Sequence, residues 1–148
     1  MKIMDSGRPA NVLLVEDNDD DVVLTRKGFE RANFSVNLYH VSNGRDCLAF
    51  LRKQGEYASS PTPDLILLDL NMPIMDGREA LSEIVRDGQL CSLPVVILTT
   101  SDAESDLTQM YQLRCNSYIK KPVDFQQFRQ IIETLGNYWF TVAFLPSR

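Results

Sequence analysis

The fold is decided by the stretch Leu65-Ile66-Leu67-Leu68-Asp69-Leu70-Asn71-Met72-Pro73. Its four branched apolar residues in succession are typical of a strand buried on both faces, as in a parallel sheet. Two more continuous apolar runs, Val12–Val15 and Val95–Leu98, have the same character, and weaker apolar segments stand at Val36–Val41 and Ser117–Ile119. We therefore predict five short strands spread along the chain.

Helix-starting signals separate these strands. Each is a side chain that favours the N-cap position, and most are followed three residues later by Glu or Gln. The candidate caps are Asn18, Asn43, Asp76 with Glu79, Ser101 with Glu104, and Asp124 with Gln127. Strands that alternate with helices imply a parallel sheet covered on both faces through right-handed crossovers. We predict an α/β fold: a flavodoxin-like, doubly wound, five-stranded parallel sheet of (βα)5 order.

The length and the charge bound the possible functions. The 148 residues suffice for one domain, which we assign to residues 10–136, with an N-terminal extension at 1–9 and an aromatic C-terminal tail at 137–148. A net charge of −5 argues against binding of nucleic acid or of an anionic membrane surface. No apolar run is long enough to span a bilayer.

The cysteines and the histidine narrow the chemistry further. The three cysteines, Cys47, Cys91 and Cys115, share no close spacing, which favours a reducing cytoplasmic location and excludes a CxxC metal site. A single histidine, His40, excludes any mechanism that needs two.

Acidic, hydroxyl and ammonium groups follow the predicted strands. Glu16 and Asp17 follow the first, Asp69 the third, Thr99 the fourth and Lys121 the fifth. In an open α/β sheet these positions converge on one edge, where ligands bind. Two carboxylates about 5 Å apart repel by roughly 3 kcal/mol at an effective dielectric constant of about 20. A Mg²⁺ ion, which prefers oxygen ligands, would relieve this repulsion, and the set suits a transferring phosphoryl group with Asp69 as nucleophile.

These residues carry a resemblance to a known family. The sequence resembles the response-regulator receiver domain of two-component signalling in Glu16-Asp17, in the run from Asp69 to Gly77, in Thr99 and in Lys121-Pro122. The resemblance implies that Asp69 is the phosphoacceptor and that Glu16 and Asp17 bind Mg²⁺, either directly or, for Glu16, through water.

The resemblance also implies roles for the remaining site residues. The backbone carbonyl of Asn71 is the third protein ligand of the metal, Thr99 contacts the phosphoryl group, and Lys121 pairs with it. The Lys121–Pro122 peptide bond is expected to be cis. Tyr118 falls on the aromatic position that switches together with Thr99. The partner implied is a sensor histidine kinase, with a downstream effector or phosphorelay protein.

The C-terminal tail resembles a narrower group within this family. Its aromatic run, together with Thr99-Thr100-Ser101, looks like the single-domain regulators of cyanobacterial and other bacterial phytochromes. Two interpretations of the tail stay open: it covers the protein's own core, or it forms a homodimer interface, which we favour. The residues expected at that interface are Tyr138, Trp139, Phe140 and Phe144.

Three other functions compete with this one. A Mg²⁺-dependent aspartyl-phosphate phosphohydrolase normally has an acid two residues after the nucleophile, where this chain has Asn71. A flavodoxin-like flavin binder needs a phosphate-holding loop after the first strand, where this chain has acids. A pseudo-receiver that binds partners without phosphorylation is disfavoured by the complete site.

Overall fold

The strands form a single parallel sheet. The computed structural model describes residues 8–32 and 35–142. Its strands are listed in chain order: β1 (Ala10–Val15), β2 (Val36–Val41), β3 (Leu65–Leu68), β4 (Val95–Thr99) and β5 (Ser117–Lys120). They pair in the order β2-β1-β3-β4-β5, and every pairing is parallel. The predicted fold class is thereby confirmed.

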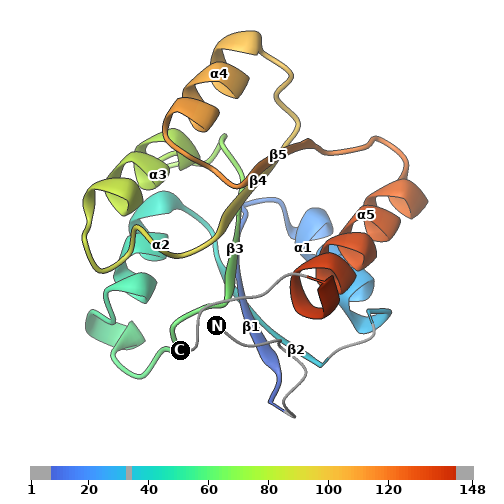
Figure 1. Cartoon of the computed structure of the whole chain (residues 1–148), viewed down its shortest axis with the longest axis horizontal. Coiled ribbons are helices and arrows are strands. Elements are labelled where there is room, and N and C mark those ends of the chain that lie inside the picture. Colours follow the sequence, from blue (N-terminus) through green and yellow to red (C-terminus); the bar gives the residue numbers. More distant parts are fainter. Residues whose placement is uncertain (1–7, 33–34, 143–148) are drawn as a thin grey trace.

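The helices cover both faces of this sheet (Figure 1). They are α1 (Asp19–Glu30), α2 (Gly44–Leu51), α3 (Gly77–Arg86), α4 (Glu104–Gln112) and α5 (Phe125–Asn137). One hydrophobic cluster joins α2, α3 and α4 to the sheet, and a second joins α1 and α5 to it. Alternate residues of β1 serve the two clusters: Leu13 faces the first and Leu14 the second, as the strand period of two requires.

Four of the five predicted helix caps are confirmed. Asn18, Asn43, Asp76 and Asp124 each accept a hydrogen bond from the backbone N–H three residues later. The cap predicted at Ser101 is wrong, because α4 begins after Ala103, whose side chain makes no cap hydrogen bond. The Ser101 hydroxyl instead donates to the Asp106 carboxylate, at 2.7 Å, and accepts from the backbone N–H of Ala103.

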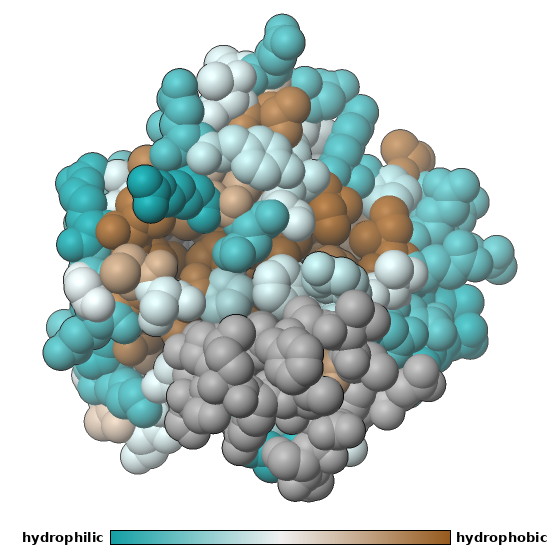
Figure 2. Space-filling model, viewed as in Figure 1, coloured by the Kyte–Doolittle hydropathy of each residue, from teal (hydrophilic) through white to brown (hydrophobic). Residues whose placement is uncertain are grey.

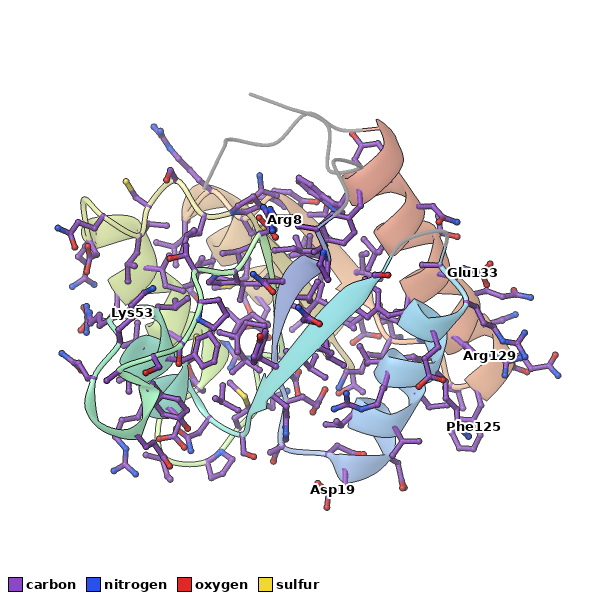
Figure 3. The ribbon with its side chains drawn as sticks, turned by 90° about the horizontal axis from the view of Figure 1, so that it is seen from below. Arg8, Asp19, Lys53, Phe125, Arg129 and Glu133 are labelled. Atoms are coloured by element: carbon purple, nitrogen blue, oxygen red, sulfur yellow. The ribbon has the colours of Figure 1, made fainter. Side chains whose placement is uncertain are left out.

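The end of the N-terminal extension is tied to the sheet. Arg8, which Figure 3 places beside the start of β1, makes a two-pronged ion pair with Asp64, at 2.9 and 3.0 Å. Asp64 is buried and also accepts from the backbone N–H of Asn11. This contact fastens the chain entering β1 to the residue that precedes β3.

One aromatic side chain of the tail points inward. After Asn137 the chain continues as a single π-helical turn, η2 (Tyr138–Val142). Phe140 is fully buried in the cluster under α1 and α5, so its assignment to a dimer interface was wrong. The physical reason is that the helix runs on past residue 136 and carries Phe140 over the sheet. Trp139 packs partly against the same cluster, Tyr138 is exposed, and Phe144 lies outside the described residues.

Within the described residues, no helix combines the length and the apolar character needed to cross a bilayer.

Candidate functional site

Three carboxylates meet at the carboxyl edge of the sheet. Val15 and Leu68 are direct partners in neighbouring strands, so Glu16, Asp17 and Asp69 leave the sheet side by side. One oxygen from each of the three lies within 4.8 Å of the others. Glu16 and Asp69 are buried, while Asp17 is exposed. The convergence predicted for these three residues is therefore present, and their geometry suits one divalent cation with room left for other oxygen ligands.

The ammonium group of Lys121 reaches into this cluster. Its Nζ donates hydrogen bonds to Glu16 and, at 2.8 Å, to Asp21, and lies 3.6 Å from Oδ2 of Asp69. Lys121 is buried, whereas its neighbour Lys120 is exposed and pairs with Asp102 at the surface. Alternation along the strand separates the two lysines, and the residue expected to face the site does so.

Asp21 is a site residue that our sequence reasoning missed. It stands in the first turn of α1 beside Asp19 and Asp20, where acidic residues are favoured by the helix dipole alone. Only the position of the start of α1 beside Lys121, the residue that follows β5, selects Asp21 from the three as its partner. The one available signal was its position, one turn after the acidic pair.

Burial and clustered charge shift the pKa values here. Burial, and then the nearby Asp69 carboxylate, raise the pKa of Glu16 to about 7, while the hydrogen bond from Lys121 acts in the opposite direction. Burial alone would lower the pKa of Lys121, but its hydrogen bonds with Asp21 and Glu16 outweigh burial, and its pKa is raised. Lys121 therefore stays cationic, and the buried carboxylates hold more negative charge than it can neutralise.

The backbone around Asp69 is held tightly. The N–H of Leu70 donates to Asp69 Oδ1 at 2.8 Å, which leaves Oδ2 on the side of Lys121. The start of α3 is hydrogen-bonded to this loop, because the N–H of Gly77 donates to the Leu70 carbonyl. A Cβ at Gly77 would lie only 2.0 Å from the Asp69 carbonyl oxygen, so a side chain at this position would force the Asp69 loop to move.

Thr99 and Tyr118 border the neighbouring loop. Thr99 is fully buried at the end of β4, and its hydroxyl accepts from the backbone N–H of Ser101. The Tyr118 hydroxyl donates to the Ser101 carbonyl at 3.0 Å, and its ring packs partly against the core beneath α4. Both residues thus contact the loop between β4 and α4, which is the arrangement a coupled pair requires.

The peptide bond before Pro122 corrects one expectation. It is trans, as is every peptide bond in residues 8–32 and 35–142. Trans is the more stable isomer even before proline, so a cis bond persists only where tertiary contacts select it. Here Lys121 reaches its three carboxylates with the trans bond.

His40 has a structural role beside the site. Its Nε2 lies 2.6 Å from the backbone carbonyl oxygen of Glu16. Because a carbonyl only accepts, this nitrogen carries the proton and donates it. The bond helps to orient the first acidic residue, and it leaves this nitrogen unavailable as a phosphate carrier.

Comparison with known protein families agrees with the function that this geometry suggests. Residues 12–133 match the family described as the response regulator receiver domain. The chain belongs to this family. The resemblance found in the sequence is thereby confirmed, and the receiver domain occupies most of the chain. Receiver domains of this kind are components of signalling systems.

Several relatives resemble this receiver over nearly their full length. Response regulator Rcp1 of Synechocystis is 38% identical over 143 residues, which are 97% of each chain. Among solved structures, the phosphorylated cyanobacterial phytochrome response regulator RcpA superposes with a TM-score of 0.91 at 41% identity, covering 95% of this chain and all of that one. The Mn²⁺-bound form of Rcp1 gives a TM-score of 0.90 at 38% identity, covering 94% and 100%.

Proposed function

We propose that this receiver accepts a phosphoryl group on Asp69 from the phosphohistidine of a sensor histidine kinase, with Mg²⁺ as cofactor. The observation that carries the proposal is the gathering of Glu16, Asp17 and Asp69 within 4.8 Å beside the buried ammonium of Lys121. Carboxylates so close together are costly unless a cation joins them. The donor set consists of oxygens only, which fits Mg²⁺.

The residues divide the chemistry among them. Mg²⁺, held by Asp17, Asp69, the carbonyl of Asn71 and Glu16 directly or through water, would withdraw charge from the phosphoryl oxygens. An oxygen of the Asp69 carboxylate forms the new bond to phosphorus, while the phosphorus–nitrogen bond of the phosphohistidine breaks and its electron pair returns to the imidazole. Lys121 compensates the negative charge on the phosphoryl group, and the hydroxyl of Thr99 is available as a donor.

The relatives support a proposal about the class of kinase. RcpA is a cyanobacterial phytochrome response regulator, and this chain is 41% identical to it. We therefore propose a phytochrome-type histidine kinase in the cytoplasm as the phosphate source, and a protein effector or phosphorelay partner as the recipient of the signal. A transfer profile against several purified kinases, scored by initial rate, tests this choice.

An exposed apolar rim offers the kinase a docking surface. Four exposed apolar residues stand at the end of the molecule that carries the site. They are Val23 on α1, Ile74 after β3, Val123 just before α5 and Phe125 at the start of α5, with exposed fractions of 50%, 67%, 95% and 69%. Figure 3 shows Phe125 pointing away from the body of the protein, toward the same end as Asp19. Apolar side chains that surround a phosphoacceptor suit a helical partner that presents a phosphohistidine.

Substitution of Phe125 by Ala tests this surface. We expect phosphotransfer from the kinase to slow by about tenfold, since an exposed aromatic anchor contributes about 1–2 kcal/mol at a protein interface. Labelling by acetyl phosphate, which needs no docking, should keep its rate. The control is Tyr111→Ala, another exposed aromatic, which lies on α4. Equal loss with both donors would assign Phe125 to the folding of the site instead.

The homodimer remains part of the proposal, on a smaller surface. A groove of about 290 Å³ beside the edge strand β5 is lined by Ile119, Ile131, Leu135, Tyr138 and Trp139. An apolar groove next to an unpaired strand edge suits a second copy of the same surface. Sedimentation of Tyr138→Ala tests this, and an unchanged monomer–dimer distribution would remove Tyr138 from the interface.

Removal of the metal tests the proposed chemistry directly. We expect EDTA to stop labelling of the protein by acetyl phosphate, and excess Mg²⁺ to restore it, because the clustered carboxylates otherwise repel the phosphoryl group. The readout is the amount of phosphorylated protein on a phosphate-affinity gel. Labelling that is indifferent to EDTA would contradict the metal site. Steady turnover of assorted phosphate esters would favour the phosphohydrolase, although the exposed amide of Asn71 stands where that enzyme needs an acid.

A further inference from the structure

Arg78 and Asp106 form a two-pronged ion pair between α3 and α4. The Nε of Arg78 donates to Asp106 Oδ1 at 2.6 Å, and Nη2 donates to Oδ2 at 2.7 Å. Asp106 is buried although it belongs to the first turn of α4, and Arg78 belongs to the first turn of α3. Parallel hydrogen bonds of this kind fix the relative orientation of the two groups as well as their distance.

The same guanidinium contacts the loop that follows Asp69. Its Nη1 donates to the side-chain oxygen of Asn71 at 3.3 Å and lies 3.5 Å from the carbonyl oxygen of Leu70. Leu70 in turn donates its N–H to the Asp69 carboxylate. Arg78 therefore spans from the backbone next to Asp69 to the first turn of α4.

Asp106 continues the connection on the other side. Asp106 accepts a hydrogen bond from the hydroxyl of Ser101. The N–H of Ser101 donates to the hydroxyl of Thr99, and the carbonyl of Ser101 accepts a hydrogen bond from the hydroxyl of Tyr118. The hydrogen bonds from Leu70 through Arg78, Asp106 and Ser101 all join buried or half-buried groups. Together they connect the Asp69 loop to the Thr99 and Tyr118 side of the site.

The rest of α4 is lightly held. Of its residues only Asp106 and Met110 are buried, while Leu107 and Tyr111 are exposed. Its carboxyl end borders a cavity of about 450 Å³ that also contacts Leu81 and Ile84 of α3. Figure 2 shows hydrophobic side chains on this face of the molecule, between α3 and α4. A helix with so little packing depends strongly on its few polar contacts. They include the two-pronged pair with α3, the Ser101 hydroxyl on Asp106 and the Tyr118 N–H, which donates to the Tyr111 hydroxyl.

We propose that Arg78 is a positioning residue that, through Asp106, makes α4 respond to the state of Asp69. Displacement of the Asp69 loop pulls on Arg78, and displacement of the β4–α4 loop pulls on Asp106, so neither loop moves independently while the pair is intact. The proposal rests on the phosphorylation proposed above and adds a route by which its effect reaches α4.

The pair is not a pH sensor. Hydrogen bonds from Arg78 and then from Ser101 lower the pKa of Asp106 to about 2. A carboxylate whose pKa is lowered on folding adds stability above its unfolded value, near 4, and loses that contribution as the pH falls toward 2. The connection is therefore fully charged at neutral pH, and only movement of its parts can alter it.

The test uses beryllofluoride with Mg²⁺, a stable mimic of a phosphoryl group on a carboxylate. Fluorine NMR reports whether the mimic is bound, and hydrogen exchange of residues 101–112 reports the response of α4. In the unsubstituted protein we expect the mimic to change the exchange rates by about fivefold or more, the lower end of ordinary allosteric coupling. In Arg78→Ala the fluorine signal should persist while the ratio of exchange rates with and without the mimic falls close to one.

The controls separate coupling from simple loosening. Looser packing of α4 would speed exchange with and without the mimic and leave the ratio unchanged, which would overturn the proposal. Arg86→Ala removes an exposed arginine from the same helix that bonds only to Ser82 in the described part of the chain, and it should behave like the unsubstituted protein. Arg78→Lys should restore part of the response, and Asp106→Asn replaces Arg78→Ala if the latter does not fold. A missing fluorine signal in the unsubstituted protein would overturn the proposed phosphorylation itself.

Discussion

Asp69→Asn is expected to abolish phosphorylation by a histidine kinase and by acetyl phosphate alike. The amide lacks the anionic oxygen that forms the bond to phosphorus. Within residues 8–32 and 35–142, no other acidic residue stands beside both Lys121 and the Leu70 N–H as Asp69 does. Labelled protein separated on a phosphate-affinity gel provides the measurement. The amount of label should fall from near saturation to background.

The same variant should remain folded. It removes one of three clustered carboxylates, and the Asp69 charge is one of the causes that raise the pKa of Glu16. We therefore expect its free energy of unfolding to be retained or increased, which thermal denaturation would show. Asp19→Asn, an exposed acid on the same edge of the molecule, is the matched control and should be labelled normally. Full labelling of Asp69→Asn would move the phosphoacceptor to another residue.

Phe140→Ala is expected to cause the largest loss of stability. The ring is fully buried under α1 and α5, and truncation of a buried phenylalanine typically costs about 3–5 kcal/mol through lost transfer free energy and the cavity left behind. Urea unfolding followed by the fluorescence of Trp139, the single tryptophan, measures the change conveniently.

Tyr138→Ala is the matched control for Phe140. Its ring is half exposed and two positions away, so its removal should change the free energy of unfolding by about 1 kcal/mol or less. If Phe140→Ala costs no more than Tyr138→Ala, the tail is not part of the core. The contrast also separates core packing from self-association, because Tyr138 is exposed and belongs to the proposed dimer surface, whereas Phe140 is buried.

Much of the fold was predictable from local pattern. The runs at Leu65–Leu68 and Val36–Val41 became strands with the predicted bounds, because a continuous or alternating apolar segment has few other ways to bury itself. Four N-caps were predictable because a cap and its N–H are three residues apart. The exception, Ser101, had the right spacing, but α4 begins only after Ala103, and the Ser101 hydroxyl accepts from the N–H of Ala103 while it donates to Asp106.

The site residues also include some that the sequence predicts and some that only the structure identifies. Glu16, Asp17, Asp69 and Lys121 could be predicted to meet, because strand order places the carboxyl ends of parallel strands at one edge. Asp21 could not be singled out from its two acidic neighbours, and the ion pair of Arg78 with Asp106 left no local signal. Both contacts depend on where helices lie relative to distant elements.

The amino-acid sequence alone determined the order of strands and helices along the chain and the edge at which the carboxylates gather, and it led us to propose Asp69 as the nucleophile. These follow from short-range periodicity and from the geometry of parallel sheets, which any chain with this pattern must obey. The tertiary structure decided which acid of α1 binds Lys121, that Phe140 points inward, and how α4 is tied to the Asp69 loop. Those outcomes depend on packing between segments up to 100 residues apart, where angles and close contacts select one partner among chemically equal candidates.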